Sequence, residues 1–273
     1  MEPDVSVVVP VFDEEGAAPT LAREIAAAFA GRAFELIFVN DASRDGTAAA
    51  LAALRGEIPQ LRLLAHARNA GQSRAVRSGV LAARGPIVVT LDGDGQNDPA
   101  DAPRLVDRLA SGPPSLALVG GVRVKRQDSA AKKIASRLAN GVRRSLLKDS
   151  AADTGCGLKA MRREAFLRLP YFDHLHRYLP ALMIREGYEV AFEPVGHRSR
   201  STGRSKYTNL GRLWAAVSDL SGVMWLISRA RSPGEVSEAG SGERREHHRD
   251  DEQVESAGEQ GHGNSGETRL ARR

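Results

Sequence analysis

The sequence predicts an α/β fold built on a mostly parallel, doubly wound sheet. Over the first 120 residues, short apolar runs of strand length alternate with Ala- and Leu-rich stretches of helical length. The chain has 273 residues, which fits one large α/β domain or two small ones. Strands that alternate with helices return to the sheet by right-handed crossovers, so neighbouring strands run parallel.

The expected strands are short runs of β-branched and aliphatic residues. They are Val5–Val9, Phe34–Val39, Leu61–Ala65, Ile87–Leu91 and Leu116–Val119. The expected helices lie between them, at about Ala17–Phe29, Thr47–Arg55, Gly71–Ala83 and Ala100–Leu109. The pair Asp98-Pro99 indicates where the last of these helices begins, because proline fits the first helical position.

The pattern changes after Gly121. Residues 122–148 hold nine Lys and Arg and one acid within a helical pattern, and 157–195 predict a strand, a helix and a strand. A basic, glycine-containing loop then precedes a helix of about Leu210–Ser228, and past Pro233 large apolar residues almost disappear. We therefore expect a main domain over 1–208, an amphipathic helix over 209–231 and a disordered polar tail over 232–273.

Composition narrows the class of protein. The single cysteine, Cys156, excludes an intramolecular disulfide framework, and the N-terminal MEPDVSVVVPVF predicts a strand rather than a signal peptide. No apolar run reaches the 18 or so residues of a membrane span. The net charge is +5, but residues 232–273 hold ten acidic and six basic residues, so the remainder carries +9. That charge favours a phosphate-bearing or anionic partner, although simple solubility would explain it too.

Acidic and polar residues follow three of the predicted strands at the point where each strand ends. They are Pro10, Asp13 and Glu14, then Asn40, Asp41 and Asp45, then Asp92, Asp94 and Gln96. In an open parallel sheet, ligands bind beyond the carboxyl ends of the strands. The oxygen ligands of Asp92, Asp94 and Gln96 suit Mg²⁺ or Mn²⁺, although any one loop carboxylate alone would equally be a solvated surface group. The EF-hand, Rossmann and P-loop patterns are absent, which counts against an NAD enzyme or a P-loop kinase.

Six segments in order resemble the family 2 glycosyltransferases: PVFDEE, NDASRDGT, RNAGQSRAVRSGV, TLDGDGQNDP, DTGCGLKAM and RSTGRSKY. More narrowly, they resemble the branch that contains dolichyl-phosphate mannose synthase and the bacterial undecaprenyl-phosphate sugar transferases. The resemblance covers about residues 4–230 and implies the GT-A nucleotide-diphospho-sugar transferase fold. It implies a hexosyltransferase that moves a sugar, with inversion, from a UDP- or GDP-sugar to a polyprenyl phosphate, assisted by Mg²⁺ or Mn²⁺. The sugar and the choice between UDP and GDP stay open.

The resemblance also implies roles for individual residues. The residues expected to bind the nucleotide are Pro10, Val11, Asp13, Glu14, Asp41, Asn69, Gly71 and Asp92. The residues expected to bind the metal are Asp92, Asp94 and Gln96. Phosphate binding falls to Arg123, Arg126, Arg200, Ser205 and Lys206. The catalytic candidates are Asp94, Asp153, Arg200 and Lys206. Two alternatives are open: Asp153 would equally hold its own loop, and the segment around Asn69 and Gly71 would equally be a tight turn. A strong general base is not obligatory, because a phosphate acceptor is already largely ionised.

A polyprenyl acceptor resides in a bilayer, so the expected location is cytoplasmic and peripheral, at the inner face of the cytoplasmic membrane. The segment Leu210–Arg231 contains both tryptophans, and its apolar part of about 15 residues is too short to cross a bilayer. This pattern favours an interfacial helix, with packing on the sheet or on another subunit as the alternative.

Other functions fit the sequence less well. An inactive or sensory nucleotide-sugar-binding paralogue remains an alternative. A sugar-nucleotide pyrophosphorylase would carry a Gly- and Arg-rich signature where this chain has PVFDEE. Nucleic-acid binding is not expected, because the basic residues are not interleaved with aromatic ones. The oligomeric state stays open.

Overall fold

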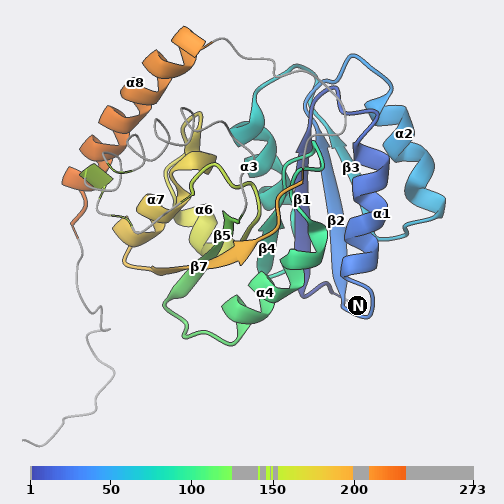
Figure 1. The fold of residues 1–273 in the computed structure, drawn as a ribbon, viewed down its shortest axis with the longest axis horizontal. Coiled ribbons are helices and arrows are strands. Elements are labelled where there is room, and N and C mark those ends of the chain that lie inside the picture. Colours follow the sequence, from blue (N-terminus) through green and yellow to red (C-terminus); the bar gives the residue numbers. More distant parts are fainter. Residues whose placement is uncertain are drawn as a thin grey trace, which may run out of the picture. The chain divides into compact units, whose positions relative to one another are not determined.

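The computed structural model describes residues 2–124, 141, 146–147, 149, 153–198 and 209–231, the last range with side chains from residue 217 onward. Within these residues, one sheet of seven strands has the order β3-β2-β1-β4-β6-β5-β7 (Figure 1). The strands are β1 (Val5–Val11), β2 (Phe34–Asn40), β3 (Leu61–Ala65), β4 (Ile87–Thr90), β5 (Leu116–Arg123), β6 (Lys159–Arg162) and β7 (Glu189–Val195). Strands β1, β2, β3 and β4 pair in parallel, as do β5 and β7, whereas β6 is antiparallel to both β4 and β5. The predicted mostly parallel sheet is confirmed.

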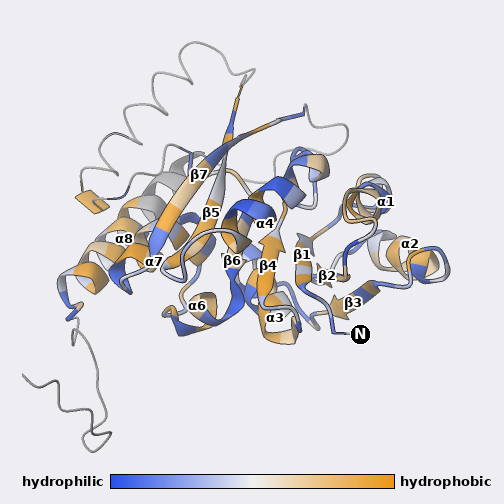
Figure 2. Cartoon of the chain, turned by 90° about the horizontal axis from the view of Figure 1, so that it is seen from below, coloured by the Kyte–Doolittle hydropathy of each residue, from blue (hydrophilic) through white to orange (hydrophobic). Residues whose placement is uncertain are grey.

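Helices cover both faces of this sheet (Figure 2). They are α1 (Ala18–Ala28), α2 (Thr47–Ala53), α3 (Gln72–Ala82), α4 (Ala102–Ala110), α6 (Arg163–Arg168), α7 (Leu179–Arg185) and α8 (Asn209–Ser228), with the 3₁₀ turns η1 (Leu54–Gly56), η2 (Pro99–Asp101) and η3 (Leu175–Arg177). Side chains of β1 alternate between two apolar cores, because successive residues of a strand point to opposite faces. Val7 and Val9 belong to the core that includes residues of α1 and α4, whereas Val8 belongs to the core that includes residues of α3 and α7.

The start of α4 shows how the sequence directs a local structure beside the carboxyl end of β4. The Asp98 side chain accepts a hydrogen bond from the Ala100 N–H at 3.1 Å, and Pro99 opens the turn η2 that leads into the helix. This is the predicted Asp98-Pro99 start, with one 3₁₀ turn before the α-helix begins at Ala102.

The segment 157–195 departs from the prediction of a single helix between two strands. It contains α6 and α7, separated by residues 169–178. Leu169 is extended (φ −69°, ψ 142°) because a residue before proline disfavours the helical conformation, and Pro170 follows. The chain then turns through His174, whose φ of 63° is left-handed, into η3. The break thus creates a short turn between the two helices, and this turn borders the site described below.

Helix α8 packs against α7 through one face. Val223 is buried, and Leu220, Leu226 and Ile227 are partly buried in the same core. The Arg185 Nε donates to the Leu226 carbonyl at 3.0 Å, and the His174 Nδ1 lies 2.8 Å from an Asp219 carboxylate oxygen. The described residues, from Glu2 to Arg231, belong to one compact unit that includes α8. Among the described residues, no helix combines the length and the apolar character of a membrane span. The expected basic helix within 122–148 and the tail lie almost wholly outside the described residues.

Candidate active site

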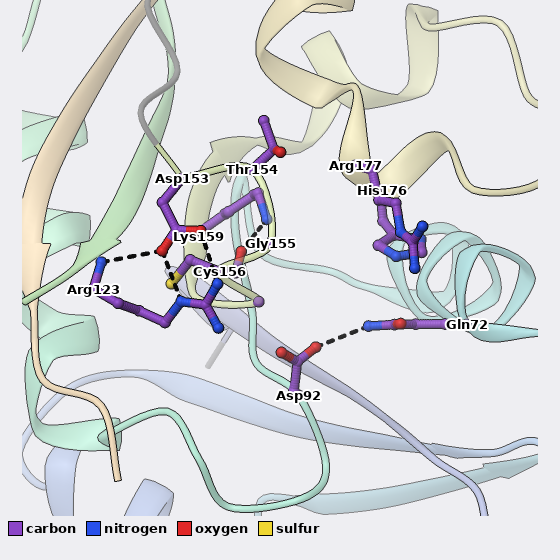
Figure 3. Close-up of a pocket in the computed structure, with 11 residues that line it drawn as sticks. Gln72, Asp92, Arg123, Asp153, Thr154, Gly155, Cys156, Lys159, His176 and Arg177 are labelled. Atoms are coloured by element: carbon purple, nitrogen blue, oxygen red, sulfur yellow. Dashed lines mark hydrogen bonds and ion pairs between the residues drawn. The ribbon is translucent and has the colours of Figure 1, made fainter. Parts of the chain in front are cut away.

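A cavity of about 330 Å³ opens beyond the carboxyl end of β4. Its walls come from five places in the chain: the start of α3, the loop after β4, the end of β5, the segment that leads into β6, and η3. The lining residues are Gln72, Asp92, Arg123, Asp153, Thr154, Gly155, Cys156, Gly157, Lys159, His176 and Arg177. Figure 3 shows the Arg123 and Asp153 side chains on one side and Gln72, His176 and Arg177 on the other, with Asp92 between them.

The turn after β4 is closed by its own polar groups. The Asp92 N–H donates to the buried Asn97 Oδ1 at 3.1 Å, and the Gln96 N–H donates to the Asp94 Oδ1 at 3.1 Å. Gly95 has a φ of 73°, which suits glycine because it lacks a Cβ. Asp92 lines the cavity, whereas Asp94 and Gln96 lie in the turn beside it. The rigid end of β4 therefore fixes the place of the predicted metal ligands.

The Asp92 carboxylate is held from two sides. The Gln72 Nε2 donates to its Oδ1 at 2.8 Å, and Gly157 approaches it so closely that a Cβ there would lie 2.3 Å from the Oδ2. Burial raises the pKa of Asp92, the charge of Asp94 raises it further, and the charge of Lys159 opposes both. Asp92 and Asp94 thus repel each other electrostatically, and a divalent cation between them would relieve that repulsion.

The donor set fits a hard divalent cation that also takes ligands from its substrate. In the part of the chain that the structure describes, no three His, Cys, Asp or Glu side chains converge on one point. The predicted ligands remain the two carboxylates, Asp92 and Asp94, and the Gln96 amide oxygen. Mg²⁺ sites commonly combine one or two carboxylates with substrate phosphates, so the predicted ligand set is compatible with such a site.

Arg123 and Asp153 form a buried ion pair on the cavity wall. The Arg123 Nε and Nη2 donate to the two Asp153 oxygens at 2.7 and 2.8 Å, and the Asp153 side chain is 7% exposed. The hydrogen bond from Arg123 to Asp153 raises the pKa of the guanidinium. Both carboxylate oxygens are thus committed to holding Arg123, which favours the loop-holding role over a catalytic role for Asp153.

The sequence did not predict a role for several residues that line the cavity, including Gln72, Lys159 and His176. Lys159 is 4% exposed, lies in register with Thr90 of β4, and donates to the Cys156 carbonyl. Burial lowers the pKa of its ammonium group. The sequence does contain one signal for Lys159. It is a single lysine in the apolar run LKAM, and a lysine without a partner rarely occupies a buried strand. His176 had no such signal, because it reaches the cavity only through the turn between α6 and α7.

The predicted nucleoside-binding residues gather at the same sheet edge, in loops beside the cavity. The buried Asp41 carboxylate accepts from the Ala70 N–H at 2.9 Å, the Gly71 N–H at 2.8 Å and the His66 ring at 2.6 Å. The Asn69 Nδ2 also donates to the Asp41 carbonyl at 3.0 Å. Through these bonds, Asp41 holds the tight turn around Asn69 and Gly71. A tight turn was the structural alternative to nucleotide binding for this segment. Contact of this turn with a nucleotide stays a prediction.

The remaining predicted nucleoside residues, Pro10, Val11, Asp13 and Glu14, lie at the end of β1 and in the loop after it. The Asp13 Oδ1 accepts from the Arg44 N–H at 2.7 Å, and the Glu14 N–H donates to the Thr47 Oγ1 at 2.9 Å, so the loops after β1 and β2 are tied together. Val11 ends β1, and Pro10 borders a small second cavity that also contacts Asp92.

The other predicted phosphate ligands, Arg126, Arg200, Ser205 and Lys206, lie outside the described residues. Three of them follow Arg198 in the sequence, and residues 197–198 contact the turn that holds the predicted metal ligands. The Arg198 N–H donates to the Gln96 carbonyl at 2.9 Å, and His197 forms an isolated bridge with Asn97. These main-chain contacts bring the start of the basic loop against the predicted metal site.

Comparison with known proteins identifies the family. The model of glycosyl transferase family 2 matches residues 6–169. An undecaprenyl-phosphate 4-deoxy-4-formamido-L-arabinose transferase from Pseudomonas aeruginosa (strain LESB58) is 38% identical over 220 residues, which cover 79% of this chain and 63% of that protein. A dodecaprenyl-phosphate galacturonate synthase from Rhizobium johnstonii is 33% identical over 85% of this chain and 69% of its own length. The chain thus spans about 63% of the length of the first of these relatives.

Solved structures share the fold. The glucosyl-3-phosphoglycerate synthase from Mycobacterium tuberculosis, solved with Mn²⁺, UDP-glucose and phosphoglyceric acid, has a TM-score of 0.62 at 20% identity, covering 85% of this chain and 82% of its own. A mannosyltransferase from Pyrobaculum calidifontis, solved with GDP-mannose and Mn²⁺, has a TM-score of 0.58 at 22% identity, covering 75% of this chain and 59% of its own. These likenesses confirm the predicted GT-A fold. The chain belongs to glycosyl transferase family 2.

Proposed function

We propose that this chain transfers a sugar from a nucleotide-diphospho-sugar to a polyprenyl phosphate. The observation that carries the proposal is the placement of the coupled carboxylates Asp92 and Asp94 at the end of β4, beside a cavity whose walls also hold Lys159, Arg123 and Arg177. Such a cavity suits an anionic ligand that brings a divalent cation with it. The names of the two curated relatives, each a transferase or synthase for a polyprenyl-phosphate sugar, support the same reaction class.

The chain's own residues would position the reactants. Gln72 holds the Asp92 carboxylate, and the cations of Arg177 and Lys159 favour the charge of the donor diphosphate and of the acceptor phosphate. Asp92, Asp94 and Gln96 would hold Mg²⁺ or Mn²⁺, which when bound stabilises the negative charge that develops on the departing diphosphate.

The reaction would be a single displacement. An oxygen of the acceptor phosphate attacks the anomeric carbon of the sugar, and the bond from that carbon to the diphosphate oxygen breaks, with its electron pair leaving on the nucleoside diphosphate. The configuration at the anomeric carbon inverts. The attacking oxygen is already largely deprotonated at neutral pH, because the second phosphate pKa is about 6. The ion-paired Asp153 therefore need not act as a base.

Helix α8 would bring the enzyme to its lipid acceptor. On the face turned away from α7, Val217 is 51% exposed, Met224 38% and Trp225 59%, and the Arg229 guanidinium lies 6.0 Å from the Trp225 ring centroid. Apolar and aromatic side chains beside an arginine are typical of a helix that lies in a membrane interface. We infer a peripheral position at the inner face of the cytoplasmic membrane. Co-sedimentation with vesicles of anionic lipid, weakening as salt rises, tests this position, and a wholly soluble protein at low salt would contradict it.

Transfer itself is tested with labelled UDP-glucose, UDP-galacturonate and GDP-mannose, each mixed with undecaprenyl phosphate and Mn²⁺. We expect label from at least one donor to enter the organic phase, and Asp94→Asn to abolish this transfer while the protein stays folded. Asp107→Asn, which removes a surface charge paired with Arg32, is the matched control and should keep full activity. Nucleotide binding without transfer from any donor would instead favour the inactive or sensory paralogue.

A further inference from the structure

His176 is held in the cavity wall by a serine from a distant part of the chain. The Ser73 Oγ, in the first turn of α3, lies 2.7 Å from the His176 Nδ1 and 3.4 Å from the His176 backbone nitrogen. Ser73 is 1% exposed, so its hydroxyl group is shielded from bulk solvent. His176 also borders both the main cavity and the small cavity beside it. His176 is therefore held by Ser73 at a place that borders both cavities.

The hydrogen bonds of Ser73 are those expected for one tautomer of this ring. The Ser73 oxygen accepts from the His176 backbone N–H, and its own proton is then available to be donated to the His176 Nδ1. An Nδ1 that accepts a hydrogen bond carries no proton, so the Nε2 of the neutral ring must be the donor. In that tautomer, the second ring nitrogen of His176 is an N–H group that could donate to a ligand in the cavity.

The ring also stays uncharged. Burial, followed by the charges of Lys159 and Arg177, lowers the pKa of His176 to about 3. Among the side chains on this wall, Arg177 and Lys159 are suited to the charged phosphates. A neutral N–H donor adds no further charge to this wall, so it also suits an uncharged oxygen such as a sugar hydroxyl or ring oxygen.

We propose that His176 is a specificity-determining residue that donates a hydrogen bond from its Nε2 to the transferred sugar, with Ser73 as the positioning residue that fixes the donating tautomer. The inference rests on the proposed function, since it requires a nucleotide-sugar in this cavity. It names the part of that substrate which His176 contacts: an uncharged oxygen of the sugar, rather than the diphosphate or the base.

The tautomer is tested first, without any substrate. The full chain is labelled with ¹⁵N-histidine, and His176→Gln identifies the signals of the residue. We expect an unprotonated Nδ1 and a protonated Nε2 from pH 7 down to about pH 5. Ser73→Ala should replace this single tautomer by a mixture. A protonated Nδ1 in the wild type would overturn the proposal.

The contact with the sugar is tested by calorimetry in the presence of Mn²⁺. Affinities are compared for UDP and UDP-glucose, UDP and UDP-galacturonate, and GDP and GDP-mannose. For the donor that the wild type prefers, His176→Phe should weaken the affinity for the nucleotide-sugar about 3- to 10-fold, which is the value of one hydrogen bond. The affinity for the corresponding nucleoside diphosphate should change less than about 2-fold. His176→Gln should restore part of the loss, because its amide N–H reaches toward the place of the Nε2.

The outcomes separate this inference from the proposed function. For each donor, the affinity for the nucleotide-sugar is divided by the affinity for its nucleoside diphosphate. If this ratio is the same in the wild type and in His176→Phe for every donor, His176 does not contact the sugar and the inference is wrong. If His176→Phe does not fold, the comparison of the wild type with His176→Gln and Ser73→Ala decides by the same ratio. If the folded wild type binds no nucleoside diphosphate, the proposed function fails, and the inference fails with it.

Discussion

Replacing Gly157 by alanine should displace the Asp92 carboxylate while leaving the sheet intact. Gly157 lies in the segment that leads into β6, and its carbonyl accepts a hydrogen bond from the Thr90 Oγ1 at 2.8 Å. A Cβ at this position would lie 2.3 Å from the Asp92 Cγ and Oδ2 and 2.4 Å from its Oδ1. The substitution therefore acts on one predicted metal ligand through space, without changing that residue.

The size of the effect follows from these distances. Ordinary contact begins at 3.4 Å, so the carboxylate and the new methyl group must separate by about 1 Å. Asp92 has only two side-chain torsions, so this movement breaks the hydrogen bond from Gln72, which is worth about 1.5–3 kcal/mol as a bond to a charged group. A displacement of about 1 Å near a reacting centre costs about 100-fold in rate. We expect Mn²⁺-dependent nucleotide binding to weaken about 10-fold and sugar transfer to fall about 100-fold.

The assay compares the wild type, Gly157→Ala and the control Gly56→Ala by calorimetry with UDP or GDP and Mn²⁺, and by transfer to undecaprenyl phosphate. An added Cβ on Gly56 meets no atom within 4 Å, so this control should behave like the wild type. Urea unfolding should show that Gly157→Ala loses about 1–3 kcal/mol of stability, as is typical of overpacking, and remains folded. If folded Gly157→Ala binds and transfers like the wild type, the position of Asp92 does not matter for this site.

Three further predictions concern other parts of the molecule. Burial would raise the pKa of Glu35, but hydrogen bonds from Ser6 and two arginines lower it below its ordinary value. Because the folded-state pKa is depressed, the stability from Glu35 is present above the unfolded-state pKa of about 4.3 and is lost as the pH falls through the folded-state pKa. Urea unfolding at a series of pH values should therefore show a smaller loss of stability in acid for Glu35→Gln than for the wild type, and equal losses would contradict this. Asp219→Ala removes the 2.8 Å contact with His174. Amide hydrogen exchange in η3 should therefore accelerate about 10-fold, while exchange in β1 stays unchanged. Unchanged exchange in η3 would show that this contact does not stabilise the turn. Cys156 is 1% exposed and burial raises the pKa of its thiol, so a disulfide reagent should modify it about 100-fold more slowly in the folded protein than in urea, and similar rates would place the thiol at the surface.

The local pattern of the chain predicted the strands, most of the helices and the edge at which the site lies. Periodicity reports which face of an element is apolar, and parallel strands bring their carboxyl ends to one edge. For this reason Asp41 and Asp92 could be placed near each other from the sequence. The ordered motifs led to the family, and the comparisons confirm it.

The partners of individual side chains were decided only by the tertiary structure. Asp153 pairs with Arg123 across 30 residues, and Ser73 holds His176 across 103 residues. These side-chain pairings depend on the antiparallel insertion of β6 between β4 and β5 and on the break after α6. Neither feature produces a periodic pattern of apolar residues in the sequence. A pattern along the sequence reports the environment of a residue, whereas the identity of its neighbour depends on how distant elements pack.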